Sequence, residues 1–159
     1  MGIIYIPVPL GEESVREFLI AEGFSLPDEI GESRNPTVQE LRFVLDNLDE
    51  FDVSYCSEDG PHSYWEADVE WAAAPDEGPW AVIRVLPFDG DESVPTGFCF
   101  SKGWEEAVVL ILERIARICG PFVLLDDSAM EPLLVTPGLN VDAAIQEWNA
   151  RIEAHTVVG

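Results

Sequence analysis

One stretch of the chain alternates strictly between apolar and polar side chains. From Tyr64 to about Ala72, every second position is apolar: Trp65, Ala67, Val69 and Trp71. The positions between them hold one tyrosine and three acids: Tyr64, Glu66, Asp68 and Glu70. Because successive side chains of a β-strand point to opposite faces, this pattern predicts a strand with one face in the core and one acidic face. Burial on one side only favours an antiparallel sheet whose other face is open to solvent.

Other strands are predicted as a run rather than in alternation with helices. Short apolar or alternating stretches predict them near residues 3–6, 51–56, 80–88, 97–101 and 122–125, with 133–135 as a candidate for one more. Apolar spacing predicts helices over about 14–23, 37–49, 103–119 and 140–154. A run of strands favours an α+β fold, a mostly antiparallel sheet of about five strands with helices packed on one face. The length fits a single domain over residues 1–159.

Three details refine this outline. Thr37 and Glu40 have the spacing of a capping box at the start of the second helix. Glu113 and Arg117 stand four residues apart on the longest helix and are expected to form an ion pair. The stretch 80–88 is apolar on both faces except for Arg84, which places that strand centrally in the sheet.

The chain is strongly acidic, with 31 acidic residues against 8 basic ones and a net charge of −23. It is also 47% hydrophobic, with five tryptophans and eight phenylalanines, so it has the material for a core. Disorder requires low hydrophobicity as well as high charge, and only the second condition holds. We therefore expect a folded domain whose self-repulsion is relieved by salt, cations or a basic partner.

The same composition excludes several function classes. Nucleic acids and anionic membrane surfaces both require clustered basic side chains, and this chain has one lysine, Lys102. The three cysteines, Cys56, Cys99 and Cys119, lack paired-ligand spacing and are expected to be buried free thiols in a reducing cytosol. The first residues lack a basic segment and a long apolar run, so no signal peptide is predicted and a cytoplasmic location is expected.

No catalytic motif accompanies the charge. The Gly-rich phosphate loops, the nucleophile-elbow pattern and the dinucleotide fingerprint are all missing from the sequence, which argues against an enzyme, and we expect no cofactor. The candidate site is the acidic strand face of Tyr64, Glu66, Asp68 and Glu70. Such a face steers a cationic partner and rejects acidic competitors, and tyrosine is enriched at binding hot spots. The alternative is that these acids only keep an exposed strand from aggregating.

In charge and size, the chain resembles small acidic inhibitors and the immunity proteins that neutralise basic nuclease toxins. This resemblance implies an acidic cytoplasmic binding protein that captures a basic protein, and nothing in the pattern specifies an oligomeric state. Two alternatives stay open. Asp126 and Asp127 follow a buried strand and offer oxygen ligands to Mg²⁺ or Ca²⁺ in a metal-dependent enzyme or cation-binding module, although an ordinary polar turn has the same sequence. The acidity also fits a halophilic-type domain with no charge-specific partner.

Overall fold

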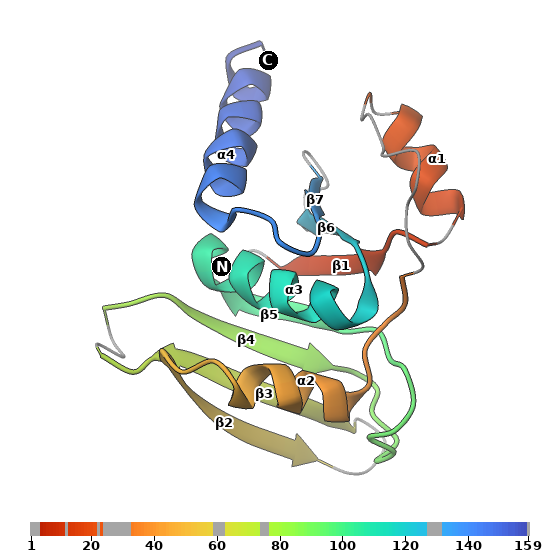
Figure 1. The fold of residues 1–159 in the computed structure, drawn as a ribbon, viewed down its shortest axis with the longest axis vertical. Helices are drawn as coiled ribbons and strands as arrows, with labels where there is room; N and C mark the ends of the chain where they lie inside the picture. The colour runs from red at the N-terminus through yellow and green to blue at the C-terminus, as the bar shows by residue number, and fades with distance from the viewer. Residues whose placement is uncertain are drawn as a thin grey trace.

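The computed structural model describes residues 4–11, 13–21, 23, 33–58, 63–73, 77–126 and 132–158, with only the backbone described for Val15, Asp126 and residues 154–158. Every predicted helix and strand forms, with adjusted ends (Figure 1). In chain order, the elements are β1 (Tyr5–Pro9), α1 (Glu13–Ala21), α2 (Val38–Asp46), β2 (Phe51–Glu58), β3 (Tyr64–Trp71), β4 (Trp80–Val85), β5 (Cys99–Gly103), α3 (Glu105–Cys119), β6 (Phe122–Asp126), β7 (Leu133–Val135) and α4 (Val141–Val158).

The described residues form one seven-stranded sheet in the order β2-β3-β4-β5-β1-β6-β7, and every neighbouring pair is antiparallel. The α+β class is confirmed, but the expectation of about five strands was too low. The difference comes from β7, which extends the sheet beyond β6, and from β1, which enters the sheet between β5 and β6 and pairs with β6 from Tyr5↔Asp126 to Pro9↔Phe122. β1 is far from β5 and β6 in the sequence, so no local pattern indicates that they are neighbours.

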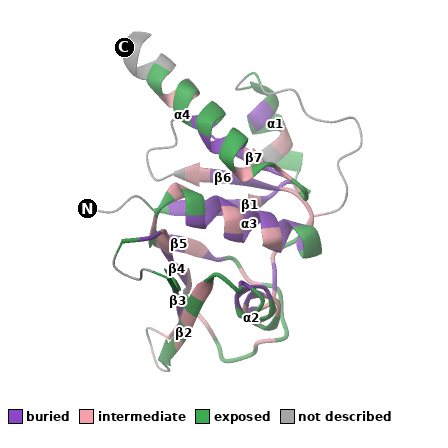
Figure 2. Cartoon of the chain, turned by 60° about the vertical axis from the view of Figure 1, so that its left-hand side comes forward, coloured by how far each residue is buried: buried purple, intermediate pink, exposed green. Residues whose placement is uncertain are grey.

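Three helices cover one face of the sheet. α3 lies between α2 and α4 and has the longest buried side, which runs from Ala107 to Cys119 (Figures 1 and 2). α4 adds Trp148, which is 1% exposed. The centroids of the Trp148 and Tyr5 rings lie 5.9 Å apart. The main core therefore lies between the sheet and these three helices.

α1 lies on the other face, so the expectation that all helices pack on one face is wrong for this helix. Along β6, Phe122 and Leu124 belong to the main core, whereas Val123 between them packs with Leu19 of α1 and with Leu10. Alternation along a strand places these two groups on opposite faces. Among the α1 side chains that the structure describes, only Leu19 is buried in this way, and the cluster it joins is small.

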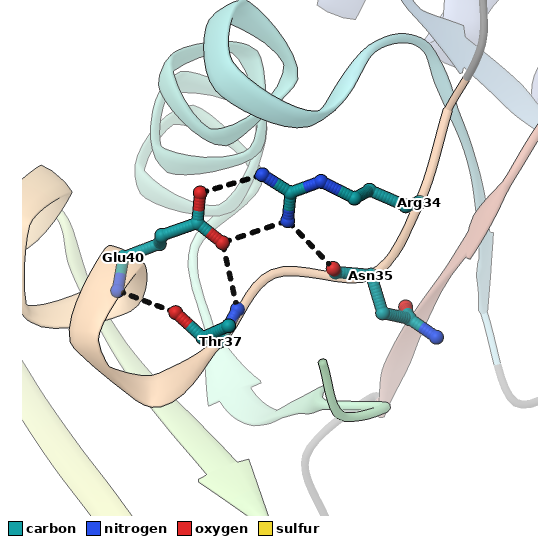
Figure 3. Close-up of polar contacts among 4 residues, drawn as sticks. All are labelled: Arg34, Asn35, Thr37 and Glu40. Carbon is teal, nitrogen blue, oxygen red and sulfur yellow. Dashed lines mark hydrogen bonds and ion pairs between the residues drawn. The ribbon is translucent and has the colours of Figure 1, made fainter. Parts of the chain in front are cut away.

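The predicted capping box at the start of α2 is confirmed (Figure 3). The Glu40 N–H donates to Thr37 Oγ1 at 3.1 Å, and the Thr37 N–H donates to Glu40 Oε1 at 3.0 Å. Arg34 extends this motif, because its guanidinium donates to both carboxylate oxygens of Glu40 at 2.7 Å each. The Arg34 N–H also donates to the Cys119 carbonyl at 3.0 Å. The start of α2 is thereby tied to the end of α3.

Candidate functional site

β3 has the two faces that its sequence predicts. Trp65, Ala67 and Val69 are at most 1% exposed and belong to the main core. The candidate residues Tyr64, Glu66 and Asp68 lie half-buried on the opposite face, and Glu70 is exposed there. Trp71 lies on the same side as these three residues, but it ends the strand and is 36% exposed. The structure thus keeps all four candidate residues on the side of β3 that faces away from α2, α3 and α4.

Strand register brings further residues beside these four. On one side, Glu58, Cys56, Ser54 and Asp52 of β2 lie opposite Tyr64, Glu66, Asp68 and Glu70 in turn. On the other side, β4 places Arg84 opposite Glu66, Val82 opposite Asp68 and Trp80 opposite Glu70. We call these side chains the acidic face, which comprises Asp52, Ser54, Cys56, Glu58, Tyr64, Glu66, Asp68, Glu70, Trp80, Val82 and Arg84. It carries five carboxylates and one guanidinium, and no described helix packs on it.

Arg84 neutralises one carboxylate of the acidic face, Glu66. Its Nε donates to Glu66 Oε2 at 3.1 Å, and its guanidinium carbon lies 4.9 Å from the centroid of the Tyr64 ring. The sequence pattern singled out Arg84 as the polar exception in its strand but did not connect it with the acids. Only the register of β3 against β4 makes that connection. Glu66, one of the four candidate residues, is therefore half of an ion pair.

Tyr64 and Cys56 meet at one end of the acidic face. The Cys56 sulfur lies 3.7 Å from the Tyr64 hydroxyl, and this contact is the main reason why the pKa of Tyr64 is raised. Cys56 is exposed, so the expectation that all three thiols are buried is wrong for this residue. Cys119 is buried as expected, because its side chain is 3% exposed, and burial raises the pKa of its thiol to about 11. Cys99 is half-buried, and its pKa is also raised by burial.

The other end of the acidic face keeps its negative charge. Asp52 and Glu70 lie directly opposite one another, and Asp68 is the next residue on that side of β3. None of the three forms an ion pair with a basic residue in the described ranges. The Cβ atoms of directly opposite residues stand about 5 Å apart, and like charges at such positions destabilise the pairing. This end of the sheet is therefore under electrostatic repulsion that a cation would relieve.

Apolar side chains and one lysine border the charged end. Trp80 and Val82 are half-buried, although no described element covers them. Lys102 lies in β5, where it pairs with Val82 of β4. Further across the open face, Ile4 and Ile6 are 40% and 43% exposed. The surface thus combines negative charge with apolar area that water contacts.

The metal hypothesis stays a prediction. Asp126 ends β6 opposite Tyr5, but its side chain and all of Asp127 lie outside what the structure describes. Across the described ranges, no group of three His, Cys, Asp or Glu side chains is placed to hold a metal ion.

No helix in the described part of the chain has the length and apolar character needed to cross a bilayer. None of the models of known families matches the chain, and neither does any curated protein or solved structure.

Proposed function

We propose that this protein binds a basic protein partner and that the acidic face is the contact surface. The observation that supports this most directly is the charged end of that face. Asp52, Asp68 and Glu70 lie together on an open sheet surface without a basic partner among the described residues. A basic side chain from a partner would remove their mutual repulsion and add attraction.

The acidic face also offers the other components of a protein interface. Trp80 and Tyr64 are aromatic, and aromatic residues are enriched where binding energy concentrates. Val82 lies opposite Asp68, so charged and apolar contacts would alternate across the surface. Arg84 is fixed by Glu66 and favours a partner with an acidic or carbonyl oxygen at that point. Charge therefore speeds association, and the mixed pattern selects the partner.

The net charge of −23 extends the same argument to long range. A strongly acidic protein attracts a basic one before contact, and this steering weakens as salt is added. Small acidic inhibitors and immunity proteins bind basic toxins and enzymes by this principle, and we place this chain in that functional class. We also place it in the cytoplasm, where such a partner would be neutralised.

The test is an affinity capture from the native lysate with the full chain as bait, washed at low and at high salt. The critical variant is Asp52→Asn with Asp68→Asn and Glu70→Gln. Its matched control removes three charges from exposed acids elsewhere: Glu13→Gln, Glu17→Gln and Glu147→Gln. We expect one basic protein to be retained in stoichiometric amount by the wild type and the control and lost by the critical variant. Equal retention by both variants, or the absence of a basic partner, would refute the proposal.

Salt adaptation is the competing explanation for the acidity, and it makes a separate prediction. A halophilic domain loses its fold in dilute buffer because the repulsion between its acids is no longer screened. A binding module stays folded there. Circular dichroism over a salt series distinguishes the two before any partner is known.

A further inference from the structure

A pocket of about 410 Å³ opens on the opposite side of the sheet from the acidic face. It lies where the end of β3 and the start of β2 meet the first turns of α3 and α4. Its apolar wall consists of Phe51, Trp71, Leu110 and Val141. This volume falls within the range of small-molecule sites, which are mostly apolar with a few polar groups at defined positions.

Trp71 is held in this wall by a glycine. A Cβ atom placed on Gly78 would stand 2.2 Å from Cε3 of the Trp71 indole, far inside contact distance. Gly78 is buried, and the absence of a side chain lets the indole lie directly against the loop backbone. The Ala72 N–H also donates to the Glu50 carbonyl at 3.0 Å, which joins the end of β3 to the residue before β2. The tryptophan is thus positioned at the pocket even though it is 36% exposed.

Three acids complete the lining: Glu50, Glu106 and Asp142. All three are exposed, and in the described ranges none forms an ion pair. Glu106 and Asp142 stand in the first turns of α3 and α4, where an acid also stabilises the helix dipole. Glu50 lies outside any helix and has no such role. The pocket therefore combines an apolar, partly aromatic wall with three acids, and one of these acids, Glu50, does not serve to stabilise a helix dipole.

The lining of this pocket contains no basic residue. A second cavity of about 190 Å³ adjoins the pocket, shares Glu50, Phe51 and Leu110 with it, and is also lined by Asp49 and Arg114. The Arg114 guanidinium is paired with another acid, since its Nε lies 3.7 Å from Glu113 Oε1. A cationic group is therefore favoured in the larger pocket, where no basic residue offsets the acids of the lining.

We propose that this pocket binds an organic monocation, an ammonium or guanidinium group carried on an apolar chain or ring. The cation would lie near Trp71, since cations are attracted to the faces of aromatic rings, and the acids would add Coulomb attraction. Its apolar part would be buried against Phe51, Leu110 and Val141. A hydrated metal ion has no apolar part, so it would gain only the Coulomb attraction to the acids. This pocket lies on the side of the sheet that α3 and α4 cover, so it is independent of the acidic face on the other side.

The probe for the test is phenethylamine, which is an ammonium ion at neutral pH, titrated into the full chain at physiological ionic strength. Calorimetry and tryptophan fluorescence give its affinity, and 2-phenylethanol is the neutral counterpart of the same shape. We expect one saturable site for the amine and binding at least about tenfold weaker for the alcohol, which corresponds to about 1.4 kcal/mol.

Variants locate the site and separate it from general attraction to an acidic protein. Trp71→Ala and Gly78→Ala should each weaken amine binding by about tenfold, and Glu106→Gln by a few-fold. Trp104→Ala removes another exposed tryptophan, and Glu147→Gln removes another exposed acid, so both should leave the affinity unchanged. Circular dichroism of each variant confirms that it is folded. Equal affinity for the alcohol, binding unaffected by both Trp71→Ala and Gly78→Ala, or no saturable binding would overturn the proposal.

Discussion

Replacing Glu40 with glutamine should lower the free energy of unfolding by about 1–2 kcal/mol at neutral pH. Hydrogen bonds from the Arg34 guanidinium are the main reason why the pKa of Glu40 is lowered to about 2. The ordinary pKa of a glutamate is 4.5, so the lowered pKa corresponds to about 3 kcal/mol at about 1.4 kcal/mol per pH unit. The Arg34 side chain is 47% exposed, however, and solvent screening weakens its interaction with Glu40. We therefore expect a loss of about 1–2 kcal/mol rather than about 3 kcal/mol.

The pH dependence of this loss follows from the direction of the shift. Because the folded-state pKa of Glu40 is depressed, its contribution is fully present above about pH 4.5 and disappears as the pH falls toward 2. Glutamine still accepts the Thr37 N–H of the capping box, so the variant isolates the charge interaction with Arg34.

The measurement is urea unfolding of the wild type and Glu40→Gln from pH 7 to pH 2. The quantity compared is the difference between the two proteins, since protonating the many other acids changes the stability of both alike. Glu147→Gln, on an exposed acid of α4, is the control and should match the wild type throughout. A difference that stays constant down to pH 2, or that is missing at pH 7, would show that the Arg34–Glu40 contact does not stabilise the fold as described.

Three further predictions concern the acidic face, the core and the metal hypothesis. Asp68→Asn with Glu70→Gln should raise the melting temperature in dilute buffer by relieving repulsion worth up to about 1 kcal/mol, and the gain should vanish in molar salt; a gain that persists there is not electrostatic. Trp148→Ala should destabilise the protein by about 3–5 kcal/mol in urea titrations, because it empties a fully buried site beside Tyr5; a loss below about 1 kcal/mol would mean that α4 is not part of the core. If the metal hypothesis holds, calorimetry with Mg²⁺, Ca²⁺ and Mn²⁺ will show a saturable site that Asp126→Asn abolishes, and its absence would remove that hypothesis.

The local features of the fold were predictable because each depends on neighbours along the chain. The two faces of β3 follow from the period of two in its sequence, and burial of Trp65, Ala67 and Val69 confirms them. The Thr37–Glu40 capping box and the Glu113–Arg117 ion pair, at 2.6 Å, also formed as their spacing predicted.

The sheet order could not be predicted in this way. β1 pairs with β6 across most of the chain length, and β7 extends the sheet beyond β6. Such pairings are chosen by how well whole faces can be buried together, a property of distant segments that no short window contains. For the same reason, the sequence pattern did not predict that α1 packs on the other face of the sheet from α2, α3 and α4.

For the candidate site, too, the sequence predicted the features that depend on neighbours along the chain but not those that depend on distant segments. Sequence periodicity alone identified Tyr64, Glu66, Asp68 and Glu70 as one acidic surface, because side chains two residues apart in a strand share a face. Strand register then added Asp52 opposite Glu70 and paired Glu66 with Arg84, and the packing of β3 against two helix ends created the pocket at Trp71. Which charges are neutralised and which surfaces are hollow depends on contacts between segments distant in sequence, and only the tertiary structure determines those contacts.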